Sequence, residues 1–321
     1  MSRILTGIQS SGVPHLGNIL GAIIPAVELS KTFESFFFIA DLHAITTVKD
    51  ATDLKKNTLA TAAAWLAFGL DTNTNILYRQ SDIPQVTELM WYLNCITPYP
   101  MLANAHSFKD KSNKLSDVNA GLFTYPVLMA ADIILYNANI VPVGKDQLQH
   151  LEMTRDIARS FNHIFGETFI IPEAITQENH MIIPGTDGKK MSKSYNNYIN
   201  ILGPEKVLKK QIMSIVTDSK GLEESKDPND CHIFQLYKLI GNKEQIQDLN
   251  NNYINGGFGY GHAKNELLKL ILSKYKTPRL KFDELMRNPQ KIEDELQKGS
   301  EKAKEIANSV LKKVKNNLGL M

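Results

Sequence analysis

A chain of 321 residues can hold one large domain or two ordinary ones, and 43% hydrophobic with 22% charged residues is typical of a folded globular protein. No apolar run reaches membrane-spanning length and the first residues lack a signal-peptide pattern, so we expect a cytoplasmic protein with no membrane partner. Two cysteines exclude a disulfide framework and a zinc site, and a net charge of +2 means that any nucleic acid would be bound by local patches.

The chain opens with a strand, a turn of small residues and a helix. Arg3 to Gln9 reads as the strand, Ser10-Ser11-Gly12 as the turn, and Leu16 to Leu29 has apolar residues at helical spacing. This order can form a βα unit whose backbone N–H groups face a phosphate. Taken alone, it is more often a plain strand-to-helix turn.

Strands and helices then alternate. An apolar strand is expected at 35–40, an Ala-rich helix at 54–70 closed by Gly69, a strand at 75–78 and a helix at 85–94, followed by a loop around Pro98 and Pro100. The alternation predicts an α/β fold with a parallel sheet covered by helices.

The helix expected from Tyr125 to Tyr136 carries an acid on an apolar face. Tyr125, Met129 and Asp132 share that face at i, i+4 and i+7. An indole offers one N–H donor and no acceptor, so a carboxylate among Met and aromatic side chains would match it. The alternative is that Asp132 caps or pairs inside the protein.

Two further segments could contact a phosphorylated ligand. Phe108 to Ser112 is a cationic loop in which Lys111 would be the contact, or else an exposed charged turn. Ile140 to Gln147 reads as a strand, a glycine turn and a helix start, where ligands bind in parallel sheets and where Asp146 could also serve as an N-cap.

Lys190-Met191-Ser192-Lys193-Ser194 places lysines and hydroxyls in one short loop after Gly188. Mobile ammonium groups can follow the charge that develops on a leaving pyrophosphate, so the loop suits a polyphosphate, although lysine-rich turns are usually solvated surface. Amphipathic helices are expected afterwards, at 205–216, 233–240, 263–273 and 301–317, with a loop at 225–230.

The lysine loop is identical to the signature loop with which class I aminoacyl-tRNA synthetases bind ATP. His15-Leu16-Gly17-Asn18 resembles the "HIGH" signature of the same enzymes, with asparagine in place of the last histidine. The chain is similar to the bacterial tryptophanyl-tRNA synthetases over almost its full length, although Leu5 stands where an aromatic residue is usual. The similar segments are Gly7-Ile8-Gln9, Gly17-Asn18, 128–133, 141–150, 190–194, Gly259-Tyr260-Gly261 with Lys264, and Val314-Lys315 with Gly319-Leu320.

The resemblance implies a Rossmann-like parallel sheet, the class I synthetase core, followed by an all-helical C-terminal domain. The catalytic domain would be residues 1–188, with a connecting insertion around 50–120. Residues 189–321 would hold the signature loop and the helices that meet the tRNA anticodon end, with the last helix packing back on the core.

It also implies the site residues. Asp132 would accept the indole N–H in a pocket lined by Tyr125, Met129, His43 and Gln147, and the catalytic residues would be Lys190, Lys193 and Asn18. ATP would be held by Gln9, Ser10, Ser11, Gly17, Asn18, Lys111, Gly144, Lys145, Asp146, Ile183, Lys190, Met191, Ser192, Lys193 and Ser194.

The expected activity is activation of L-tryptophan with ATP and transfer to tRNA(Trp). Mg²⁺ would bridge the phosphates with few protein ligands and no dedicated metal site, and the protein would be a homodimer. Three alternatives stay open: a tyrosyl-tRNA synthetase, a small-molecule adenylylating ligase, and a synthetase-derived binding protein without activity.

Overall fold

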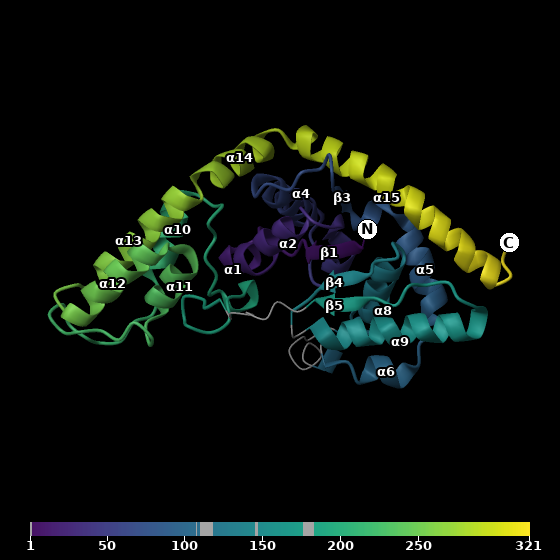
Figure 1. Ribbon diagram of the computed structural model, residues 1–321, viewed down its shortest axis with the longest axis horizontal. Coiled ribbons are helices and arrows are strands. Elements are labelled where there is room, and N and C mark those ends of the chain that lie inside the picture. The colour runs from purple at the N-terminus through teal and green to yellow at the C-terminus, as the bar shows by residue number, and fades with distance from the viewer. Residues whose placement is uncertain (1, 107, 110–117, 145–146, 176–182) are drawn as a thin grey trace.

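The computed structural model describes residues 2–106, 108–109, 118–144, 147–175 and 183–321. It has a parallel sheet with its helices on one side of Figure 1 and a group of helices on the other, and α14 and α15 run across the top of both. The expected fold class, an α/β parallel sheet followed by a helical region, is confirmed.

The sheet has five parallel strands in the order β3-β2-β1-β4-β5. The strands are β1 Arg3–Gln9, β2 Glu34–Ala40, β3 Ile76–Arg79, β4 Ile140–Pro142 and β5 Glu173–Ile175. The sequence pattern did not indicate β5, because a three-residue edge strand with partly exposed side chains has no apolar run.

Successive side chains of a strand point to opposite faces, and each face has its own core. Phe37, Ile39 and Leu77 pack with α1 Leu16–Asn18, α2 Ile24–Leu29 and α4 Ala51–Ala67. Phe36, Phe38 and Tyr78 pack on the other face with α5 Pro84–Asn94, α8 Ala120–Ile134 and α9 Leu148–Phe165.

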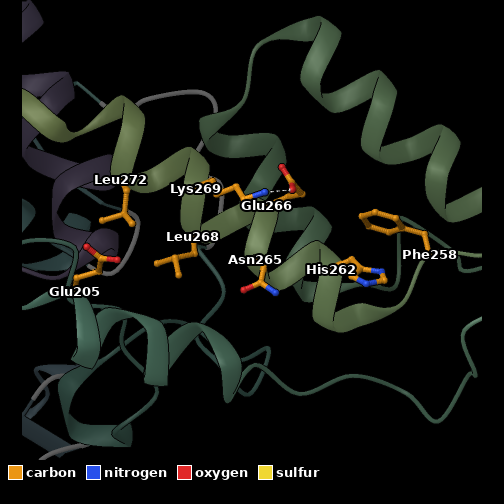
Figure 2. Close-up of a pocket in the computed structure, with 8 residues that line it drawn as sticks. All are labelled: Glu205, Phe258, His262, Asn265, Glu266, Leu268, Lys269 and Leu272. Atoms are coloured by element: carbon orange, nitrogen blue, oxygen red, sulfur yellow. Dashed lines mark hydrogen bonds and ion pairs between the residues drawn. The ribbon is translucent and has the colours of Figure 1, made fainter.

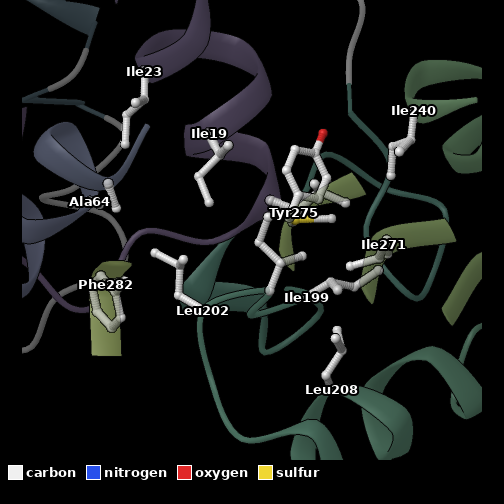
Figure 3. Close-up of a cluster of buried hydrophobic side chains, with 14 of the residues drawn as sticks. Ile19, Ile23, Ala64, Ile199, Leu202, Leu208, Ile240, Ile271, Tyr275 and Phe282 are labelled. Atoms are coloured by element: carbon white, nitrogen blue, oxygen red, sulfur yellow. The ribbon is translucent and has the colours of Figure 1, made fainter. Parts of the chain in front are cut away.

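The first core continues into the helical region. Ile19, Ile23, Ile199, Leu202 and Tyr275, labelled in Figure 3, belong to one buried cluster and are nearly excluded from solvent. Apolar packing therefore connects the helix after β1 with the segment that follows the lysine loop.

One prediction in the first half was wrong, and one expected helix differs in its detail. The expected loop around Pro98 and Pro100 contains helix α6 Tyr99–Ala103, because Pro100 lies in the first turn, where a missing N–H costs nothing. The helix expected at 16–29 is continuous but contains a π-helical segment, Ile19–Ile23, which ends two residues before Pro25.

The second half is helical as expected, with more helices than the pattern indicated. They are α10 Glu205–Met213, α11 His232–Ile240, α12 Lys243–Asn255, α13 Tyr260–Lys274, α14 Lys276–Arg287 and α15 Pro289–Asn317. The expected start of the last helix at 301 was wrong. Its first three turns bury Ile292, Leu296 and Gly299 among charged residues, which is a weak hydrophobic signal.

Helix α15 lies against the edge strand β3. A Cβ added to Gly299 would lie 1.7 Å from the carbonyl oxygen of Leu77, so the helix and strand backbones are in direct contact. Arg79 Nη2 pairs with Glu293 at 2.8 Å, and Ser300 Oγ donates to Asp82 Oδ2 at 3.0 Å. The helix thus covers a sheet edge that would otherwise be open.

Several lysines of α15 are also bonded to the rest of the protein. Lys315 pairs with Glu88 at 2.6 Å, and Lys298 and Lys313 donate to Asn73 and to the backbone of Thr168. These lysines anchor the helix on the core, which leaves them less suited to binding a phosphate backbone.

We expect Gly299→Ala to lower the free energy of unfolding by about 3 kcal/mol, because the new methyl group must push α15 away from β3. Thermal unfolding followed by circular dichroism measures the loss. Gly261→Ala is the control, since nothing lies within 4 Å of the added methyl at that helical position. Equal effects of the two substitutions would show that the backbone contact does not stabilise the fold.

Candidate active site

The two signature segments, far apart in the chain, meet in the structure. The backbone N–H of Gly17 donates to Met191 Sδ at 3.3 Å, and the N–H of Leu16 donates to the carbonyl of Ile199 at 2.8 Å. The start of the helix after β1 and the lysine loop therefore form one site beyond the carboxyl end of a parallel strand, which is where ligands bind in such sheets.

The first segment is held by a reciprocal cap. The N–H of His15 donates to Asn18 Oδ1 at 3.1 Å, and the N–H of Asn18 donates to His15 Nδ1 at 3.3 Å. Burial, with a smaller effect of the charge on Lys193, lowers the pKa of His15 to about 4, so the ring is neutral at pH 7 and can accept this bond. The oxygen of Asn18 is used in the cap, so its NH₂ group is the part suited to a ligand oxygen.

Lys193 crosses the turn after β1. A Cβ built on Gly12 would lie 2.8 Å from Lys193 Nζ, and Gly12 has a φ of +147° that favours glycine. Burial lowers the pKa of Lys193 to about 8. Within the described part of the chain no acid pairs with this ammonium, and an anionic ligand would relieve the cost of burying it.

The lysine loop is itself fixed by a hairpin and one asparagine. Met191 N–H donates to Ile183 O at 2.9 Å. Asn197 is 2% exposed, accepts from Ser192 N–H at 2.7 Å and donates to Asp187 Oδ1 at 2.7 Å. Asn197 was not predicted as a site residue, because nothing in the local pattern of the sequence shows that it bonds back across the loop.

Asp132 is fully buried at 1% exposure and receives two side-chain donors. His43 Nε2 lies 2.8 Å from Oδ2, and Gln80 Nε2 lies 2.8 and 2.9 Å from Oδ1 and Oδ2. Burial raises the pKa of Asp132, and the hydrogen bonds from His43 and Gln80 oppose that rise. Asp132 therefore does pair inside the protein, as the alternative reading predicts. One of its two partners, His43, is also a residue expected to line the amino-acid pocket.

The other residues expected around Asp132 form a chain of contacts. The rings of His43 and Tyr125 lie 6.1 Å apart, Tyr125 Oη shares a 2.8 Å hydrogen bond with His150 Nε2, and His150 Nδ1 is 3.1 Å from Gln147 Oε1. Met129 lies one turn before Asp132 and packs against the second core. Gln80 and the buried His150 were missed as individual site residues, because only the fold brings them here.

Gln9 links the two halves of the site. It ends β1, and its Nε2 donates to the carbonyl of His43 at 2.9 Å. Ser10 is fully buried and its Oγ accepts from Thr58 Oγ1 at 3.2 Å, whereas Ser11 is exposed, so Ser11 is the more accessible of the two hydroxyls.

Of the other residues expected to bind ATP, the structure describes some and not others. Gly144 forms the turn between β4 and α9, where its carbonyl accepts from Gln147 N–H at 2.9 Å. Lys111, Lys145 and Asp146 lie outside the described residues.

A separate open cavity of about 490 Å³ lies between α10 and α13, as Figure 2 shows. It contains none of the predicted site residues, and Lys269 and Glu266 pair on its wall at 2.9 Å. The lining residues are Glu205, Phe258, His262, Asn265, Glu266, Leu268, Lys269 and Leu272.

Comparison with known proteins gives consistent matches. The family described as "tRNA synthetases class I (W and Y)" matches residues 1–276. The chain is 49% identical to the tryptophan–tRNA ligase of Fusobacterium nucleatum, covering 100% of this chain and 99% of that protein. It is 48% identical to the tryptophan–tRNA ligase of Rhodopirellula baltica, covering 99% of each. The crystal structure of tryptophanyl-tRNA synthetase from Campylobacter jejuni complexed with ADP and tryptophan is similar with a TM-score of 0.95 and 46% identity, covering 99% of this chain and 100% of that one.

Proposed function

The chain belongs to the class I tRNA synthetases of the W and Y type, and on this basis we infer that it is a tryptophan–tRNA ligase. It is an ATP-dependent enzyme that activates L-tryptophan as the adenylate and transfers it to tRNA(Trp). The structural observation that carries this function is the 3.3 Å contact between Gly17 and Met191, which joins the two signature segments in one site.

Asp132 is the proposed acceptor for the indole N–H. The carboxylate is buried, and the hydrogen bonds from His43 and Gln80 favour its ionised form, in which it can accept a further hydrogen bond. Tyr125, Met129, His43 and Gln147 surround this group in our assignment, which the contacts of His43 and Tyr125 support. A phenol, which must donate and accept, fits a pure acceptor less well than an indole.

The ATP phosphates are assigned to Lys190, Lys193 and the NH₂ group of Asn18. Lys193 supports this assignment through its position across the turn after β1 and through its burial. The remaining proposed ATP contacts are the following residues: Gln9, Ser10, Ser11, Gly17, Lys111, Gly144, Lys145, Asp146, Ile183, Met191, Ser192 and Ser194.

The reaction needs no protein nucleophile. An oxygen of the tryptophan carboxylate bonds to the α-phosphorus of ATP, the bond from that phosphorus to the bridging oxygen breaks, and pyrophosphate leaves with the electron pair. A terminal ribose hydroxyl of the tRNA then attacks the carbonyl carbon and loses its proton, and AMP leaves with the electron pair of the bond between that carbon and the phosphate oxygen. The protein contributes alignment and charge stabilisation, with the lysines nearest the developing negative charge.

Mg²⁺ is proposed to bind with ATP and to neutralise phosphate charge. Among the residues that the structure describes, no three His, Cys, Asp or Glu side chains gather into a metal site, so phosphate oxygens and water would supply most ligands. Removing the metal with a chelator should stop pyrophosphate exchange, and exchange that continued would refute this part.

The partners beyond the substrates are also proposals. We assign tRNA to the helical region and retain the division at residue 188, which limited proteolysis can test. A homodimer is supported by two exposed aromatic side chains, Trp91 on α5 and Tyr99 on α6, which are 67% and 71% exposed. Sedimentation of the intact protein measures the oligomeric state.

Among the helices in the described residues, none could span a membrane. Cytoplasmic localisation is a proposal that cell fractionation can test.

The decisive experiment is pyrophosphate exchange with each of the twenty amino acids, followed by charging of tRNA(Trp). We expect exchange that depends on tryptophan, and an aminoacylated tRNA as the final product. Exchange with tyrosine instead would favour the tyrosine enzyme. Exchange without tRNA charging would favour a small-molecule ligase, and no exchange would favour a binding protein.

A further inference from the structure

Gln80 has a buried amide whose orientation is fixed at both ends. It is 0% exposed and begins the short turn η2 Gln80–Asp82 directly after β3. Its Oε1 accepts from the N–H groups of Leu42 and His43 at 3.2 and 3.4 Å. Because these partners are donors, the amide NH₂ must be the end that faces the carboxylate of Asp132.

The donors on Asp132 are distributed unequally between its oxygens. Oδ2 receives both Gln80 and His43, whereas Oδ1 receives Gln80 alone. A carboxylate oxygen can accept two hydrogen bonds, so Oδ1 is the oxygen with acceptor capacity left. Because Gln80 contacts both oxygens, it also holds the carboxylate group in one orientation, and this sets the direction from which Oδ1 can accept a further hydrogen bond.

The turn that carries Gln80 is anchored independently of the pocket. Ser81 N–H donates to Asp41 Oδ1 at 3.0 Å, and Ser81 Oγ donates to Oδ2. On the other side, Asp82 pairs with Arg79 and accepts from Ser300 of α15. Gln80 is therefore held by two elements that do not include Asp132, as a positioning residue requires.

We propose that Gln80 positions the Asp132 carboxylate so that Oδ1 meets a single ring N–H donor, and that it thereby sets the preference for a donor-bearing ring. The proposal rests on the tryptophan specificity proposed above and adds the residue that aims its acceptor. Gln80 acts through Asp132 and requires no contact with the reacting atoms.

The test compares tryptophan with the analogue in which sulfur replaces the indole N–H, 3-benzothienylalanine. The quantity measured is the ratio of kcat/KM for the two amino acids in pyrophosphate exchange. In Gln80→Met, which keeps the length of the side chain but removes the amide NH₂ donor and the Oε1 acceptor, we expect this ratio to fall about tenfold or more with the KM for ATP unchanged. Gln85→Met is the matched control, because the amide of Gln85 donates to Asn308 of α15, away from Asp132; its ratio should equal the wild-type ratio.

A second variant covers the case in which Gln80→Met does not fold. Gln80→Glu keeps the acceptor for Leu42 and His43 but places a second carboxyl beside Asp132, so its preference for tryptophan should decline as pH rises and the shared proton is lost. An unchanged ratio in a folded variant, even with lower overall activity, would overturn the role of Gln80. A wild-type protein without tryptophan-dependent exchange would instead overturn the proposed function.

Discussion

Replacing Asp132 by asparagine is expected to lower kcat/KM for tryptophan about a hundredfold while the KM for ATP stays near the wild-type value. The change removes a charged acceptor from a fully buried position and leaves the donors of His43 and Gln80 facing a neutral amide. Losing a hydrogen bond to a charged group costs about 1.5–3 kcal/mol, which accounts for an effect of this size. Steady-state pyrophosphate exchange with each substrate varied in turn measures both constants.

The control for this substitution is Asp156→Asn, which exchanges the same atoms at a half-exposed ion pair with Arg159 on α9. It should leave both constants unchanged. If Asp132→Asn weakened the use of tryptophan and of ATP equally, Asp132 would be a structural residue and the indole would need another partner.

Removing the ammonium of Lys193 with Lys193→Ala should slow adenylate formation about a hundredfold to a thousandfold at saturating tryptophan and ATP. The ammonium lies against the turn at Gly12 and is brought there by the fixed loop from Lys190 to Ser194. A group that stabilises charge only as pyrophosphate leaves affects the rate of the chemical step more than binding. Single-turnover quench-flow measures that rate directly.

Lys189→Ala is the matched control, since Lys189 belongs to the same lysine-rich stretch but is exposed. Its single-turnover rate should be that of the wild type. A Lys193→Ala enzyme with an unchanged rate would remove this lysine from the mechanism.

The pH dependence of ATP use gives an independent measurement on Lys193. Its pKa is about 8, so the free enzyme carries the positive charge below pH 8 and loses it as pH rises toward 9. We expect kcat/KM for ATP to fall over that interval. Lys193→Arg should abolish the fall, because a guanidinium stays charged, and a wild-type profile that stays flat would contradict the assignment.

The sequence predicted the parts of the site that depend on local pattern. A few neighbouring residues were enough to predict three segments: the strand at 3–9, the helix start at His15 and the lysine loop. Helices were also expected at 54–70, 85–94 and 125–136, where the structure has α4, α5 and α8 with somewhat different ends, whereas α6 was expected as a loop and only the start of α9 was expected.

Residues that act across the fold left no such pattern. Gln80 lies in a three-residue turn and meets Asp132, 52 positions away, only because β3 ends beside α8. Asn197 and His150 likewise acquire their roles from partners across a loop or a helix. A polar residue whose hydrogen bonds are all set by tertiary structure resembles any surface polar residue in sequence, so these could not be predicted.

The covering of β3 by α15 also has a consequence for biosynthesis. Arg79 of the strand and Glu293 of the helix are 214 positions apart, so a ribosome translates most of the chain between making the edge and making its cover. During that interval the unpaired backbone of β3 is available to other nascent chains or to chaperones. We therefore expect productive folding in the cell to improve when this edge is shielded until the late helix emerges.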